Sequence, residues 1–404
     1  METKKMKAML TLALLLCVSC AVSFQGQKSE SSSPTEGEPQ GTPTDSRTAS
    51  NQSLAIIPFE PGDNLAYLRV RVNGSAPLLF VLDSGAGVWV IDQSQAKTLN
   101  LKTEEQGKIT GAGAGNVDVT YTKNVSFGLP GIETRVPTVA LIDLSALAAS
   151  LGRKIDGIIG YDFFDRYVVE IDYDAYIVRL FEPKTYNYSG NSEVIPITIK
   201  KKHAYVTAKM KLAGRESVAR EYLVDSGSSD AVNDELIAQS SAPKVEVVGG
   251  VGLGQEFKVI LSRVERLQLG SIVFENTNGA SGGQKIGGEL LHRFTVIFDY
   301  SRQRMILEPN RHFRDGFVFD MFGGDLRYEQ ESKAYRVSSV YKNSPASEAG
   351  LKESDLITTI DGQPVLSFSL DQVRRMFAQE KEYNLGIRRG NDMIQVKVKL
   401  RKLL

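Results

Sequence analysis

The sequence predicts a mainly β chain made of two copies of one β-domain, followed by a smaller domain that mixes strands and helices. Short apolar or alternating runs separated by turn residues fill the region from Leu54 to Pro309, as is typical of strands. The same series of runs starts again at Val194. After Pro309 the pattern changes, and apolar residues recur at helical spacing.

Composition narrows the class of protein and of partner. A chain of 404 residues is long enough for two or three domains. Lys+Arg and Asp+Glu both number 48, so the formal charge is zero and no basic excess supports a nucleic-acid partner. Three His and two Cys leave little material for a metal site, and we expect neither a metal nor another cofactor.

The N-terminal segment is expected to be an export signal and a tether. Residues 1–20 carry lysines, then an apolar run, then small residues, which is typical of a secretory signal. Their end, "LCVSC", resembles the lipobox of bacterial lipoproteins with Cys20 as the lipidated residue, and ordinary signal cleavage nearby is the alternative. Residues 21–53 are rich in Ser, Thr, Pro, Gly and Glu and are predicted to be disordered. We therefore expect a periplasmic or cell-surface protein anchored to a membrane through its lipid.

The two β-copies share four features in the same order. Each has an apolar strand ending in Asp-Ser-Gly, then a Gly-rich stretch, then an apolar-Gly element, and last a strand reading "IDY" or "FDY". A repeat of this length indicates a duplicated domain and not a solenoid of short units.

The paired Asp-Ser-Gly motifs place Asp83 and Asp225 directly after apolar strands. A lone motif of this kind is usually only a turn, and a turn inherited by duplication without chemistry is the alternative here. However, both preceding runs are apolar enough to make a carboxylate costly without a purpose. If the copies pack about a pseudo-twofold axis, the two carboxyls meet and share one proton. The charged member can then deprotonate a water, and the protonated member can donate to the carbonyl that the water attacks.

The residues that follow each aspartate fit this arrangement. Gly85 and Gly227 allow the two turns to approach closely. The hydroxyls of Ser84 and Ser226 can form hydrogen bonds across the axis and brace the two loops.

At this point the chain resembles the retropepsin-like aspartic proteases of the pepsin clan, with two fused lobes. The resemblance covers about Leu54 to Pro309 and rests on the two Asp-Ser-Gly motifs and on the apolar-Gly elements "IIG" and "IG". It implies two closed β-barrel lobes, at 54–187 and 188–311, related by a pseudo-twofold axis, with Asp83 and Asp225 as the catalytic pair. Both motifs have Ser where Thr is commoner. Lys285 stands where an apolar residue is expected before Ile286.

The resemblance also gives roles to the residues around the pair. It implies that Ser228 lies beside a carboxylate oxygen of Asp225, whereas the first copy has Ala86 at that position. A hydroxyl there would lower the pKa of Asp225 and leave Asp83 as the proton holder. The Gly-rich stretches are expected to be two substrate-binding flaps, at about 109–121 and 247–259. The flap glycines are Gly111, Gly113, Gly249 and Gly250.

Residues 312–404 resemble a PDZ domain, most clearly in "SPASEAGLKESDLITTIDG". The segment "SLDQVRRMFAQE" is predicted to be its long helix, with Leu370, Val373 and Phe377 at helical spacing. In such domains a peptide C-terminus adds as a strand beside this helix, and a Gly-containing loop holds its carboxylate. That loop is expected within "MFGGDLRY", and a PDZ fold used only for packing is the alternative. The predicted peptide-binding residues are Phe322, Gly323, Gly324 and Leu326.

The sequence therefore predicts an aspartic endopeptidase that cuts peptides or unfolded proteins held as an extended strand between the lobes. A monomer is expected to suffice for activity. One alternative is a non-catalytic scaffold whose protease-like lobes bind peptides without cutting them. Another is an enzyme whose active sites form between two chains, each lobe pairing with its twin.

Overall fold

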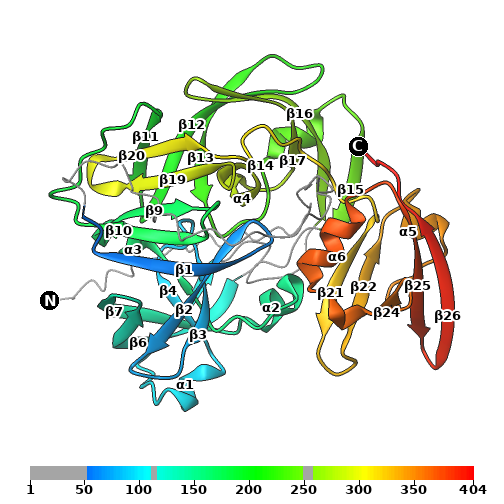
Figure 1. The fold of residues 1–404 in the computed structure, drawn as a ribbon, viewed down its shortest axis with the longest axis horizontal. Coiled ribbons are helices and arrows are strands. Elements are labelled where there is room, and N and C mark those ends of the chain that lie inside the picture. The colour runs from blue at the N-terminus through cyan, green and yellow to red at the C-terminus, as the bar shows by residue number, and fades with distance from the viewer. Residues whose placement is uncertain (1–51, 111–115, 249–257) are drawn as a thin grey trace, which may run out of the picture.

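The computed structural model describes residues 52–110, 116–248 and 258–404 and shows a mainly β protein with a C-terminal PDZ domain (Figure 1). The predicted signal with Cys20, nearly all of the predicted tether, and the four flap glycines lie outside the described residues. Those features stay predictions. Within the described ranges, no helix is both long and apolar enough to cross a membrane.

The first β-copy begins with two hairpin strands and continues through a long antiparallel hairpin to a short parallel strand. Strand β3 is almost wholly buried because its apolar run "LLFVL" lies between an antiparallel and a parallel neighbour. The elements of this copy are β1 (Ala55–Gly62), β2 (Leu65–Val72), β3 (Leu78–Leu82), β4 (Trp89–Asp92), α1 (Gln95–Thr98), β5 (Glu105–Thr110), β6 (Asn116–Leu129), β7 (Ile132–Ile142), α2 (Ser145–Leu151), β8 (Gly157–Ile159), α3 (Tyr161–Arg166), β9 (Val168–Asp172) and β10 (Ile177–Phe181).

The second β-copy repeats this order of strands, with different short helices between them. Strand β12 buries alternate side chains, as its alternating sequence predicts, whereas β19 is buried along its whole length. Its elements are β11 (Glu193–Lys200), β12 (His203–Lys211), β13 (Val218–Asp225), β14 (Val232–Asp234), the 3₁₀ helix η1 (Glu235–Gln239), β15 (Lys244–Val248), β16 (Lys258–Leu269), β17 (Ile272–Ala280), β18 (Gln284–Gly287), α4 (Gly288–Leu291), β19 (Phe294–Asp299), η2 (Tyr300–Arg302) and β20 (Arg304–Pro309).

The strand pairings of the two copies match one another. β3 pairs with β2 antiparallel and with β8 parallel, and β13 pairs in the same way with β12 and β18. β4 pairs parallel with β7 and antiparallel with β8, as β14 does with β17 and β18. Equivalent strands of one repeated topology therefore carry the two Asp-Ser-Gly motifs. The closed barrel expected for each copy stays a prediction.

The two copies are joined by strand pairing and by a shared core. Strands β9 and β19 pair antiparallel across the junction. One buried apolar cluster contains side chains of both copies, and Phe164 of the first stacks on Tyr300 of the second with ring centroids 5.7 Å apart. Because buried apolar contacts hold the copies together, the motif-bearing strand ends have a fixed relation to each other.

The C-terminal domain is a small sheet with two helices, and its apolar core is separate from that of the β-copies. Helix α6 begins at a capping box formed by Ser369 and Gln372, and it buries the predicted Leu370, Val373 and Phe377. Strand β21 lies at one edge of the sheet. The elements are β21 (Gly324–Glu329), β22 (Ala334–Val340), α5 (Pro345–Glu348), β23 (Leu356–Ile360), β24 (Gln363–Pro364), η3 (Val365–Ser367), α6 (Leu370–Phe377), β25 (Glu382–Arg389) and β26 (Asp392–Lys399).

The PDZ domain packs against the first β-copy through α6 and β21, and Figure 1 shows α2 facing both elements. Arg374 of α6 forms a 2.9 Å ion pair with Asp63, which lies in the β1–β2 turn, and donates a 2.8 Å hydrogen bond to the carbonyl of Ser150 in α2. The backbone N–H of Asp63 donates to the carboxylate of Asp371 at 3.1 Å. One largely buried arginine, with its side chain 12% exposed, therefore joins the helix to two separate parts of the first copy.

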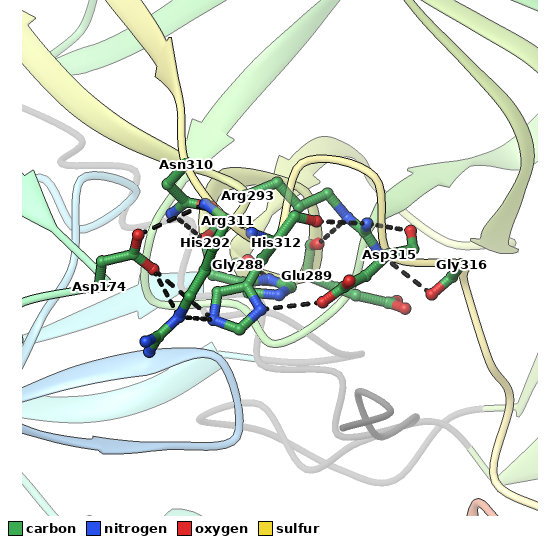
Figure 2. Close-up of polar contacts among 10 residues, drawn as sticks. All are labelled: Asp174, Gly288, Glu289, His292, Arg293, Asn310, Arg311, His312, Asp315 and Gly316. Carbon is green, nitrogen blue, oxygen red and sulfur yellow. Dashed lines mark hydrogen bonds and ion pairs between the residues drawn. The ribbon is translucent and has the colours of Figure 1, made fainter. Parts of the chain in front are cut away.

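The segment after β20 is held to the second copy by a polar cluster at α4, shown in Figure 2. The guanidinium of Arg293 donates to the carbonyls of His312, Asp315 and Gly316, and to that of Glu289 at 3.0 Å. His312 contacts the carboxylate of Asp315 at 2.9 Å. Because these contacts anchor the linker to a buried helix, the path of the chain toward the PDZ domain is fixed at its start.

Candidate active site

Parallel pairing brings the two aspartates to equivalent strand ends. Asp83 directly follows β3, and its N–H donates to the carbonyl of Ile159 in β8 at 3.0 Å. Asp225 is the last residue of β13, and its register partner is Gly287 of β18. The apolar-Gly elements predicted from the sequence thus form the strands beside each motif.

The serines of the two motifs exchange hydrogen bonds between the copies. The N–H of Ser84 donates to Oγ of Ser226 at 2.9 Å, and the N–H of Ser226 donates to Oγ of Ser84 at 3.0 Å. Each hydroxyl in turn donates to a carbonyl of the other copy, that of Val224 at 2.7 Å and that of Leu82 at 3.0 Å. This reciprocal set, which the sequence predicted in outline, fixes the two loops against each other.

The motif glycines leave room for the opposite carboxyl group. A Cβ on Gly85 would lie 2.7 Å from Oδ1 of Asp225, and a Cβ on Gly227 would lie 2.3 Å from Cγ of Asp83. Each glycine N–H also donates to the aspartate of its own motif, at 2.8 Å to Asp83 and 3.1 Å to Asp225. Any larger residue at either position would separate the carboxyls.

Both aspartates are buried, at 1% exposed each, and the groups around them affect their pKa values differently. Burial raises the pKa of Asp83 well above its usual range, and the negative charge of Asp225 raises it further. Burial also raises the pKa of Asp225, but the ammonium of Lys285 and a hydrogen bond from Asp83 oppose that rise. Asp83 is therefore the favoured proton holder of the pair.

Lys285 is a site residue whose role the sequence does not reveal, although a lysine departs from the apolar residue expected before Ile286. Its side chain is 0% exposed, and Nζ lies 3.5 Å from Oδ2 of Asp225 and 3.9 Å from Oδ2 of Asp230. Ser228, which was expected to donate to Asp225, accepts a 3.4 Å hydrogen bond from the N–H of Asp230, and its carbonyl accepts one from Gly288 at 2.6 Å. The structure thus places a cation beside Asp225.

Two further side chains reach the motif loops from distant elements. Asn64, in the β1–β2 turn, donates from Nδ2 to the carbonyl of Ser229 at 3.1 Å. His203 of β12 packs against the first loop, where a Cβ on Gly87 would lie 3.4 Å from its ring. Burial lowers the pKa of His203, so a neutral ring is favoured there. Neither contact has a signature in the sequence, because each joins segments far apart in the chain.

The Gly-rich stretches connect the strands of two antiparallel hairpins. β5 pairs with β6 up to Thr110↔Asn116, and β15 pairs with β16 up to Val248↔Lys258. The connecting residues, which include Gly111, Gly113, Gly249 and Gly250, lie outside the described residues. The hairpins are therefore present in both copies, and the role of their tips as flaps stays a prediction.

The predicted peptide-binding loop of the PDZ domain already has an internal carboxylate. The N–H groups of Phe322 and Gly323 donate to Oδ1 of Asp320 at 2.7 and 3.4 Å. Phe322 is buried and stacks on Phe377, so it is a core residue and does not present its ring to a ligand. Gly323 has φ +76, which favours glycine.

The remaining two predicted PDZ residues lie in β21. Gly324 pairs with Val340 in the sheet, and the buried Leu326 lines a pocket together with Arg374 and Leu404. Arg374 also donates to the carbonyl of Leu326 at 3.4 Å. The β21 edge, where a peptide would add as a strand, is thus close to side chains of α6 and to α2 of the first copy.

The arrangement holds two carboxyls and a braced backbone within one buried site. Among the described residues, no group of three or more His, Cys, Asp or Glu side chains is placed to hold a metal ion. A duplicated β fold that pairs two buried aspartates at facing strand ends defines, as a class, an aspartyl-protease-like site.

Comparison with known proteins supports this class. Residues 68–163 match the family model described as aspartyl protease, and residues 336–389 match that of the PDZ domain. The chain therefore contains an aspartyl-protease-like region and a PDZ domain, and it carries the signal of a peptidase.

Curated relatives share a smaller part of the chain. A probable CtpA-like serine protease of Staphylococcus haemolyticus (strain JCSC1435) is 28% identical over 101 residues, which are 24% of this chain and 20% of the relative. A protein of the same name from Staphylococcus epidermidis (strain ATCC 12228 / FDA PCI 1200) is 30% identical over 97 residues, with the same shares. The chain spans about a fifth of the length of these relatives. The words 'serine protease' in their name therefore apply to the relatives and do not assign a catalytic type to this chain.

Proposed function

We propose that this protein is an aspartic endopeptidase in which Asp83 and Asp225 together activate a water molecule. The observation that carries the proposal is the reciprocal serine bracing, which holds two buried carboxyls in contact, each against the glycine of the other motif. Two carboxyls in this position cannot both ionise cheaply, so they keep one proton between them.

The proposed reaction uses both states of the pair. The ionised carboxylate takes a proton from the water, whose oxygen attacks the carbonyl carbon of the substrate peptide bond. The carboxylic acid donates its proton to the carbonyl oxygen. As the carbon–nitrogen bond breaks, the amine takes a proton from one carboxyl of the pair, and a hydroxyl of the gem-diol returns its proton to the other carboxylate, so the pair again holds one proton. The substrate is a peptide or an unfolded protein lying extended under the β5–β6 and β15–β16 hairpins.

The name of the curated relatives raises serine catalysis as a second candidate. An activated serine needs a base within hydrogen-bonding distance that takes the proton of its hydroxyl. The hydroxyls of Ser84 and Ser226 instead donate to the backbone carbonyls of Val224 and Leu82. The motif serines are therefore used as braces, and this favours the aspartic mechanism.

Cleavage of a denatured protein by the purified chain tests the proposal. We expect cleavage at acid to neutral pH, loss of cleavage in Asp83→Asn, inhibition by a statine-containing peptide, and no effect of a fluorophosphonate that labels activated serines. A matched control is Asp92→Asn, because Asp92 is also a buried aspartate at a strand end, but its carboxylate accepts hydrogen bonds from the backbone N–H groups of Ser94 and Leu144, which both lie in the first copy. An Asp83→Asn protein that binds the peptide as the wild type does, with neither protein cutting, would identify a peptide-binding scaffold. Fluorophosphonate inhibition would identify serine catalysis.

A further inference from the structure

The two copies differ sharply in the residues that surround their aspartates. The parallel registers place Ile158 opposite Val81 in the first copy and Lys285 opposite Leu223 at the equivalent position of the second. Five residues after each aspartate, the first copy has the apolar Val88 and the second has Asp230. An apolar pair beside Asp83 is therefore replaced by an ion pair beside Asp225.

A fully buried lysine is costly unless a nearby anion compensates for its charge. The ammonium of Lys285 lies closer to Asp225, at 3.5 Å, than to Asp230, at 3.9 Å. The other ionisable groups facing this cluster are Asp83 across the junction, His203 from β12, which feels the charge of Asp225, and Glu289 from α4, which feels that of Asp230. Of the anions facing Lys285, Asp225 is thus the nearer.

We propose that Lys285 is a positioning residue for the aspartate pair: its ammonium holds the negative charge on Asp225, so that Asp83 keeps the shared proton and acts as the acid. This inference rests on the proposed function for its catalytic meaning. Which of the two aspartates carries the negative charge can, however, be tested without measuring cleavage.

The pH dependence of kcat/KM is the first test. Lys285 stabilises every ionised form of the pair, so Lys285→Met should move both the acid and the alkaline limb upward, by on the order of one unit. Well below the acid limb, kcat/KM should then fall by up to about tenfold. Lys285→Arg keeps the charge and should keep both limbs near their original positions. Limbs that do not move in a folded Lys285→Met protein would overturn the proposal and leave Lys285 as a structural partner of Asp230.

A second pair of variants protects the test against misfolding. Lys285→Ile with Asp230→Val gives the second copy the apolar side chains of the first, where Ile158 and Val88 lie in one buried apolar cluster. This double variant should fold, and its limbs should also lie above those of the wild type. Limbs equal to those of the wild type would again count against a role for Lys285 in the pair.

Thermal unfolding tests whether Asp225 carries the charge and Asp83 the proton, and it does not require activity. If the wild type does not cut, the proposed function fails, but this test of the charges still applies. An amide is a neutral replacement for a protonated carboxyl, so Asp83→Asn should keep the wild-type Tm. Asp225→Asn should lower the Tm, because Lys285 loses its nearest anion, and adding Lys285→Met should restore it. A larger loss in Asp83→Asn than in Asp225→Asn would reverse the assignment and overturn the inference.

Discussion

Asp83 and Asp225 occupy equivalent places, yet the residues packed around them differ in kind. The sequence predicted the pair, the bracing serines and the close-approach glycines, because each of these is written twice in register. It did not predict the charge beside Asp225. Lysine is almost never fully buried, so a lysine in a strand is ordinarily assigned to the surface. Only the comparison of the two copies, which marks Lys285 as a misfit against an apolar position, could have pointed to it.

The aspartate pair should behave as one unit in mutant kinetics. Asp83→Asn, Asp225→Asn and the double variant should each lose nearly the same large factor in kcat/KM, because removing either carboxyl already removes the shared proton site. Initial rates on a single peptide substrate, with folding checked by circular dichroism, measure this. Two single losses that multiply in the double variant would show that the aspartates act in separate sites.

Glu289 should make the folded state less stable as the pH rises. It is buried on α4, accepts a hydrogen bond from Asn278 at 2.8 Å, and burial raises its pKa to about 8. The unfolded chain releases this proton near pH 4.5, so between pH 4.5 and 8 the folded state binds more protons and stability falls. Each pKa unit corresponds to about 1.4 kcal/mol, so the loss at pH 7 is on the order of 3 kcal/mol.

Glu289→Gln removes this titration and should flatten the fall in unfolding free energy between pH 5 and pH 7.5, as measured by urea denaturation. Glu275→Gln is the control, because Glu275 is a carboxyl with its side chain 59% exposed. If the Glu289→Gln curve runs parallel to that of the wild type, Glu289 is not the titrating group.

At the scale of elements, the strands were predictable and the turns that place the site were less so. Alternating and apolar runs predicted the strands and their repetition, since burial on one or both faces decides such patterns. The β1–β2 turn, with Asp63 at φ +48 and Asn64 at φ +62, has no feature in the sequence that marks it as part of the site. Asn is tolerated in this conformation and common in turns, so its hydrogen bond to Ser229 cannot be told from an ordinary turn by sequence.

Both Gly-rich hairpins should close over a bound peptide. Each copy has the hairpin at a similar place after its aspartate, so a statine-containing peptide should slow amide exchange at 109–121 and at 247–259. Mass spectrometry of the free and inhibited protein measures this, and the β25–β26 hairpin of the PDZ domain serves as an internal control. Slower exchange in the first hairpin alone would mean that only one copy contributes a flap.

For the whole molecule, the sequence predicted which domains are present but not how they contact each other. The PDZ domain was recognisable from its strand–helix–strand run, whereas its docking depends on a few side chains such as Asp63, Arg374 and the carbonyl of Ser150. Contacts of this kind repeat with no period and so leave no pattern in a single sequence. They place α2 beside the β21 edge, and the same turn that receives Arg374 also carries Asn64 to the second motif loop.

Arg374→Met should release the PDZ domain from the first copy. It leaves Asp63, whose side chain is 7% exposed, without its cation, and breaking one side of a buried ion pair costs about 3–5 kcal/mol. Amide exchange should therefore speed up at least tenfold in α2 and β21, while β25 in the PDZ core keeps its wild-type rate. Arg401→Met is the matched control, since Arg401 pairs with Glu348 where both side chains are about half exposed, and such pairs contribute about 1 kcal/mol or less. Adding Asp63→Asn to Arg374→Met should cost little more, because the two residues act as one contact. Equal acceleration of amide exchange in both arginine variants, or acceleration spread over the whole chain, would show that Arg374 does not hold the PDZ domain against the first copy. If faster exchange is confined to α2 and β21, the two elements protect each other, and a peptide that binds at the β21 edge must first displace the first copy.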